Sequence, residues 1–148
     1  MTERWRPNVT VAAVIERDGR FLLVEELTRQ GLRLNNPAGH LEPGESLVQA
    51  CVREVREETA HAFRPTHLVG VYLSEPGAEG TTYLRFAFCG ELGAHAAGQA
   101  LDSGIERTLW LTFDELQASE ARHRSPLLMR GVRDYLAGAR HPLALLHP

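Results

Sequence analysis

The chain contains no lysine, so all 16 of its basic residues are arginines. Any basic side chain that holds a phosphate group must therefore be an arginine, whose planar guanidinium can donate paired hydrogen bonds. The arginines are scattered along the sequence, and the formal net charge is −3. Because nucleic-acid-binding domains concentrate positive charge on one face, we expect no nucleic-acid partner.

Cysteine is scarce as well. Cys51 and Cys89 lie far apart in apolar surroundings, without the paired spacing of a zinc site, so we predict two buried free thiols. No apolar run approaches the roughly 18 residues that span a membrane. The first residues, MTERWRPN, lack the apolar stretch and cleavage site of a secretory signal. We therefore expect a cytoplasmic protein with no membrane partner.

The length of 148 residues is enough for one domain with a hydrophobic core and too short for two ordinary ones, so we expect a single domain over 1–148. Asp18-Gly19 predicts a hairpin between strands at 9–16 and 20–26. Further strands are expected at 32–34, 67–75, 81–92 and 107–112. Because strands and helices alternate along the chain, we expect an α/β or α+β fold, with one sheet covered on its faces by helices.

The clearest helix signal follows a loop rich in proline and glycine. Ser46 is suited to be the N-cap and Gln49 completes a capping box, which predicts a helix that ends near Thr59. One face of this helix is apolar and should be buried against the sheet; it carries Leu47, Val48, Cys51, Val52 and Val55. Two later helices are expected after Thr112 and Pro126.

Three glutamates, Glu54, Glu57 and Glu58, lie within two turns at the border of this apolar face. Like charges at this spacing repel, and Arg53 can offset only part of the repulsion. A solvated face of alternating arginine and glutamate is the ordinary explanation. A hard divalent cation such as Mg²⁺ or Mn²⁺, which prefers oxygen ligands, is the alternative. The constrained loop at 37–44 favours a cation site, because it places backbone groups beside a helix N-terminus, where a phosphate is also stabilised.

Gly39, Glu45 and the run Arg-Glu-Val-Arg-Glu-Glu at 53–58 together resemble the Nudix box of the Nudix hydrolases. The segments VTVAAVIERDGRFLLVEE and LWLTFDEL extend the resemblance over most of the chain. Within the family, PAGHLEPGESLVQA, YLRFAF and RSPLL are most similar to the NudJ-type phosphatases. The resemblance implies an α/β/α sandwich around a mixed β-sheet and a Mg²⁺-dependent attack of water on a diphosphate bond, with Mn²⁺ as a possible substitute.

The resemblance also implies roles for individual residues. It assigns metal binding and catalysis to Glu54, Glu57 and Glu58. Gly39 would add its backbone carbonyl to the metal, and Glu45 would pair with Arg53 to brace the loop against the helix.

Other acidic and polar residues are candidates for the site. His40, in the loop, is a candidate substrate contact, although a packing role would explain it equally well. Glu106 and Asp102 lie in or beside the loop before the last strand, where the family often adds a carboxylate; surface solvation is the alternative for both. The chain departs from the box at Ala60 and His61, where the family has glycine and an aliphatic residue. Ala60 must either accept a left-handed conformation or leave the helix differently.

The similarity to NudJ-type phosphatases implies a small phosphorylated substrate: hydroxymethylpyrimidine pyrophosphate, thiamine pyrophosphate, or nucleoside di- and triphosphates. Two alternatives remain. One is a pyrophosphatase for ADP-ribose or a dinucleotide, and the other is a Nudix-like domain that senses a nucleotide without cleaving it. The three glutamates speak against a pure sensor. A monomer and a homodimer are both compatible with the sequence.

Overall fold

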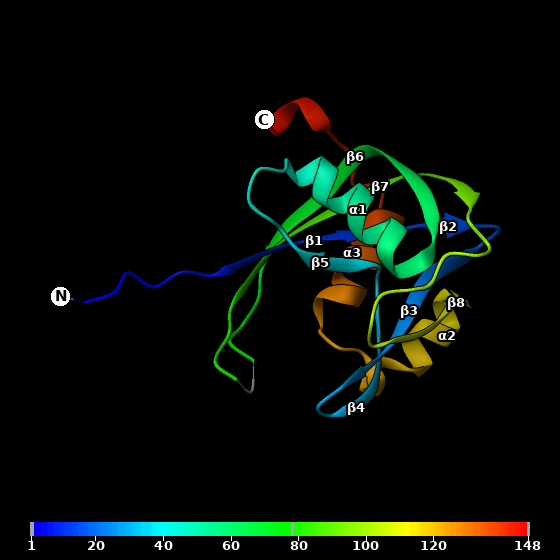
Figure 1. Ribbon diagram of the computed structural model, residues 1–148, viewed down its shortest axis with the longest axis horizontal. Coiled ribbons are helices and arrows are strands. Elements are labelled where there is room, and N and C mark those ends of the chain that lie inside the picture. Colours follow the sequence, from blue (N-terminus) through cyan, green and yellow to red (C-terminus); the bar gives the residue numbers. More distant parts are fainter. Residues whose placement is uncertain (1, 78, 148) are drawn as a thin grey trace.

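The computed structural model describes residues 2–77 and 79–147 (Figure 1). Its helices are α1 (Leu47–Thr59), α2 (Phe113–Ala118) and α3 (Leu127–Leu136), and its strands are β1 (Asn8–Ala13), β2 (Glu16–Arg17), β3 (Arg20–Thr28), β4 (Gly31–Asn35), β5 (Ala38–His40), β6 (His61–Leu73), β7 (Tyr83–His95), β8 (Ile105–Thr112) and β9 (His141–Pro142). Within these residues, no helix is long and apolar enough to cross a membrane.

The described strands form two sheets. In the first, the order is β5-β1-β7-β6-β9, and β1 runs parallel to β7 while the other pairs are antiparallel. In the second, β3 is central and pairs with β2, β4 and β8. The predicted turn at Asp18-Gly19 is confirmed: it joins β2 to β3, and both residues have positive φ. The strand predicted at 9–16 is divided, because β1 ends at Ala13 and pairs in the first sheet, so that only Glu16–Arg17 pairs with β3.

Helices pack on both sides of the strands. Neighbouring residues of a strand point to opposite faces, so each side can bury its own set of apolar side chains. Val11 and Leu22 pack with Cys51 and other residues of α1 in one core cluster. Val14 and its neighbours pack with α2 and α3 in a second cluster on the other side. The predicted α/β/α sandwich is therefore confirmed. Both cysteines are buried and free, as predicted.

The start of α1 matches the sequence prediction closely. The Ser46 side chain accepts a hydrogen bond from the backbone N–H of Gln49, and the Gln49 side chain accepts one from the backbone N–H of Ser46. The buried face of the helix is shifted from the one predicted. Glu54 and Glu58 are buried, whereas Val52 is only partly buried. The strand β5 was not predicted, since its three residues lie in a proline- and glycine-rich segment.

Candidate active site

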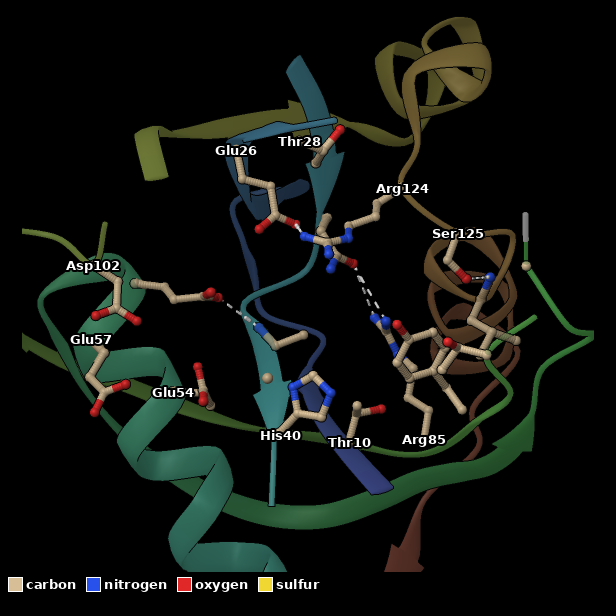
Figure 2. A pocket seen from close by; sticks show the side chains of 18 of the residues that line it. Thr10, Glu26, Thr28, His40, Glu54, Glu57, Arg85, Asp102, Arg124 and Ser125 are labelled. Atoms are coloured by element: carbon tan, nitrogen blue, oxygen red, sulfur yellow. Dashed lines mark hydrogen bonds and ion pairs between the residues drawn. The ribbon is translucent and has the colours of Figure 1, made fainter. Parts of the chain in front are cut away.

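A cleft of about 980 Å³ opens between the two sheets, beside α1 and the first turn of α3. Acidic side chains from α1 line one end of the cleft, and Arg85 of β7 lies at the other end (Figure 2). Thr10 of β1 and His40 of β5 lie between these ends. The cleft therefore brings together residues that are far apart in the sequence.

Glu54 reaches the floor of the cleft because Gly39 has no side chain. The carboxyl group of Glu54 lies directly over the backbone of β5, where a Cβ on residue 39 would come within 2.2 Å of the Glu54 Cδ. Glu54 is 7% exposed. Its burial raises its pKa to about 6, although Arg53 acts in the opposite direction.

Arg53 connects the loop before α1 to the acidic end of the cleft. Its Nη2 and Nε donate to the two carboxylate oxygens of Glu45 at 2.8 and 3.0 Å, and Nη2 also donates to the His40 carbonyl at 2.9 Å. Its Nη1 donates to Glu54 at 2.7 Å and to Glu57 at 3.2 Å. The contact between Glu45 and Arg53 that the sequence predicted is therefore present. Hydrogen bonding to Arg53 lowers the pKa of Glu45.

A third carboxylate, that of Asp102, joins Glu54 and Glu57. One oxygen atom from each of the three residues lies within 4.8 Å of the others, which is close enough for all three to contact one cation. Asp102 reaches this position because the loop at 96–104 docks on the C-terminal end of α1. The Asp102 backbone N–H donates to the Glu57 carbonyl at 2.9 Å, and the Gln99 side chain donates to the Arg56 carbonyl at 2.7 Å.

Glu58 lies in the same cleft but outside that group of three oxygen atoms. Its Oε1 accepts a hydrogen bond from the Ala38 backbone N–H at 2.8 Å, which holds it against β5. Burial raises the pKa of Glu58 to about 9, and this hydrogen bond opposes the effect only in part. In the metal-free protein, Glu58 is therefore mainly protonated at neutral pH.

The other candidates fall in different places. His40 lines the cleft, and its ring lies beside that of Tyr83, with 6.2 Å between the ring centroids. Glu106 is exposed on β8 and does not line this cleft. The neighbouring Arg107 contacts Glu25, and the alternation of the strand directs Glu106 to the other face. The structure thus brings Asp102, and not Glu106, to the glutamates of α1.

Arg85 was not among the site residues predicted from the sequence; it is 7% exposed and lines the end of the cleft opposite the glutamates. Its position in YLRFAF, with residues on both sides that are largely apolar, gave no signal beyond that of a strand. A buried arginine becomes recognisable only when the element that covers it is known.

Comparisons with known proteins agree with this architecture. A family model described as the NUDIX domain matches residues 4–130. Phosphatase NudJ of Escherichia coli strain K12 is 40% identical over 143 residues, which cover 96% of this chain and 92% of that protein. A solved structure of a NUDIX hydrolase from Nitrosomonas europaea is 53% identical, with a TM-score of 0.94 and coverage of 97% of both chains.

A more distant structure, a MutT NUDIX hydrolase from Burkholderia pseudomallei, shares the fold at 20% identity, with a TM-score of 0.75 and coverage of 88% of this chain and 98% of that chain. The family match spans most of the sequence and includes the helix that carries the three glutamates. The chain belongs to the Nudix hydrolase family.

Proposed function

We propose that this protein is a Mg²⁺-dependent phosphatase of the NudJ type, which hydrolyses the terminal diphosphate bond of hydroxymethylpyrimidine pyrophosphate, thiamine pyrophosphate or nucleoside di- and triphosphates. The observation that carries the proposal is the convergence of Glu54, Glu57 and Asp102 at one end of a cleft of about 980 Å³. The 40% identity to phosphatase NudJ supports the choice of reaction. We further propose that residues 1–148 form a single functional domain.

The donor set fits a hard divalent cation. Three carboxylates offer only oxygen ligands, and Glu57 and Asp102 remain accessible from solvent. Glu54, Glu57 and Asp102 would hold the cation, with the Gly39 carbonyl as a further proposed ligand and Glu58 beside them. When bound, the cation would neutralise phosphate charge and lower the pKa of a coordinated water molecule.

Glu54 is the proposed proton acceptor. Its Oε1 is held by Arg53 Nη1 at 2.7 Å, which leaves Oε2 to accept a proton from the attacking water. Arg53 and Glu45 keep this carboxylate in place, and His40 is a proposed contact for the substrate.

The proposal is tested by incubating the purified protein with Mg²⁺ and separate substrates, and by identifying the products. We expect orthophosphate and a monophosphate from thiamine pyrophosphate and from nucleoside diphosphates. AMP and ribose 5-phosphate from ADP-ribose, without orthophosphate from the other substrates, would instead identify a pyrophosphatase. Tight nucleotide binding without any turnover would identify a sensor.

A matched pair of variants tests the assignment of the site. Glu57→Gln keeps the size of the side chain but removes its charge, so we expect kcat to fall by roughly 100-fold or more while the fold is retained. Glu91→Gln makes the same change on an exposed part of β7, away from the cleft, and should have the activity of the unmodified protein. Equal activities of the two variants would contradict the assignment.

A further inference from the structure

Arg85 is a buried cation without an acidic partner. Its guanidinium donates to the Asn36 side-chain oxygen at 2.7 Å and makes two long contacts of 3.5 Å to Asn35. Among the described residues, no Asp or Glu carboxylate lies within 4.0 Å of it. A buried charge is ordinarily paired, so this position is unexplained by the folded chain alone.

The acidic groups nearest to Arg85 have other direct partners. Glu26 forms an ion pair with Arg124 at 2.8 Å, and the Oε1 of Glu58 accepts a hydrogen bond from the Ala38 N–H at 2.8 Å. Burial lowers the pKa of Arg85 to about 10, so the guanidinium still carries its charge at neutral pH. Arg85 is therefore a charged group at this end of the cleft without a direct ion-pair partner.

One further feature of the same end favours an anion. Ser125, just before α3, and Leu127, its first residue, line the cleft, and the dipole of a helix favours negative charge at its N-terminus (Figure 2). The Leu127 N–H is already bound to the Ser125 hydroxyl at 3.0 Å, so the helix acts through its dipole and not through this N–H. The side-chain nitrogen Nδ2 of Asn36, beside the guanidinium, is buried and has no hydrogen-bond partner in the described part of the chain. Asn36 does not line the cleft, and its side-chain oxygen acts by accepting the hydrogen bond that orients the Arg85 guanidinium.

A buried tyrosine lies beyond Arg85 in the first sheet. Thr10 and Arg85 are register partners on β1 and β7, and the next partner in this row is Tyr72 on β6. Tyr72 is 7% exposed, and its hydroxyl donates to Asp134 of α3 at 2.7 Å. A ligand group that extends from the glutamates to Arg85 therefore has buried Tyr72 beyond it. This position suits the terminal group of a ligand and not a group in its middle.

We propose that Arg85, oriented by Asn36 and beside the N-terminal end of α3, forms a subsite for the unesterified terminal phosphate of the substrate. This inference rests on the proposed function, because it assumes a diphosphate that extends from the acidic end of the cleft. A substrate with a free terminal phosphate places two negative charges beside Arg85. A diphosphate that is esterified at both ends, such as ADP-ribose, has no such group to place there. The subsite thus selects phosphatase substrates over those of a pyrophosphatase.

The test compares two ligands that are not hydrolysed, the α,β-methylene analogues of ADP and of ADP-ribose, by calorimetric titration in Mg²⁺. In Arg85→Gln, we expect the dissociation constant of the ADP analogue to rise about tenfold or more and that of the ADP-ribose analogue to change less than about threefold. Arg64→Gln removes the same charge from an exposed position on β6 and should change neither constant. Equal losses for the two analogues, or no loss, would overturn the subsite.

A stability measurement separates binding from a structural role. Arg85→Gln removes an unpaired buried charge and retains an amide that can donate to Asn36, so the ligand-free variant should resist urea at least as well as the unmodified protein. A clearly lower urea midpoint would overturn the assignment and indicate a structural arginine.

The subsite and the proposed function can fail separately. If Arg85→Gln releases orthophosphate with an unchanged KM for the diphosphate substrate, the subsite is overturned and the proposed phosphatase activity is supported. Binding of the ADP analogue that depends on Arg85, in a protein that hydrolyses nothing, would support the subsite and reject the phosphatase.

Discussion

The carboxyl group of Glu54 occupies the space in which a side chain on residue 39 would begin, with 2.2 Å between its Cδ and the position of a Cβ on Gly39. The glycine of the Nudix box is required here by this close approach, since its φ does not lie in the left-handed region. Backbone and carboxylate are thereby held together without an intervening side chain.

Gly39→Ala should therefore damage the site more than the fold. The new methyl group meets the end of a flexible side chain, so Glu54 can move away while β5 stays paired with β1. We expect kcat/KM to fall about 100-fold, because a displacement of about 1 Å is sufficient for such a loss. Steady-state kinetics and urea unfolding of the variant measure the two effects.

A double variant provides the control for Gly39→Ala. Once Glu54 has been shortened to alanine, the methyl group at position 39 has nothing to displace, and the second substitution should change activity little. Additive losses in Gly39→Ala/Glu54→Ala would show that Gly39 acts through something other than Glu54.

Arg53→Lys should weaken the site although it preserves the charge. A lysine cannot donate simultaneously to both oxygens of Glu45, to the His40 carbonyl and to Glu54, as the guanidinium does. We expect the free energy of unfolding to fall by about 1–2 kcal/mol and kcat by about tenfold. The same change at Arg56, which is exposed on α1, is the matched control, and equal effects at the two positions would contradict this role.

Local signals in the sequence were sufficient for the hairpin at Asp18-Gly19, for α1 and for its three glutamates. Each depends on residues that are close in the sequence, such as the capping pair Ser46 and Gln49. The predicted buried face of α1 was less accurate, because the contacts that bury Glu54 come from β5, which the sequence did not reveal.

Asp102 and Arg85 show why the rest of the site was harder to predict. Asp102 joins the glutamates only because its backbone N–H binds the Glu57 carbonyl, a contact between segments 45 residues apart that no local pattern encodes. Arg85 is polar in a strand, which ordinarily indicates a solvent-exposed face. Its guanidinium contacts Asn35 and Asn36, which lie 50 and 49 residues earlier in the chain.

Ala60 adopts the left-handed conformation in which the family has glycine, with φ 58° and ψ 23°, and its N–H donates to the Arg56 carbonyl. The helix end is thus kept with some backbone strain. Ala60→Gly should raise the free energy of unfolding by about 1 kcal/mol, as measured by urea unfolding. Ala50→Gly makes the same change within α1 and should lower stability by about 1 kcal/mol. A loss of stability in Ala60→Gly would contradict the strain.

The stability of the metal-free protein should fall as the pH rises from 5 to 9. Burial raises the pKa of Glu58 to about 9 and that of Glu54 to about 6, so the folded state binds more protons than the unfolded state between pH 4.5 and these values. The stabilisation is therefore complete below pH 4.5 and is lost as the pH rises through 6 and then 9. We expect a fall on the order of 4 kcal/mol between pH 5.5 and 8.5 in urea unfolding with EDTA. Glu58→Gln, which cannot ionise, should lose most of this dependence above pH 7, and an unchanged slope in that variant would show that Glu58 does not carry the buried proton.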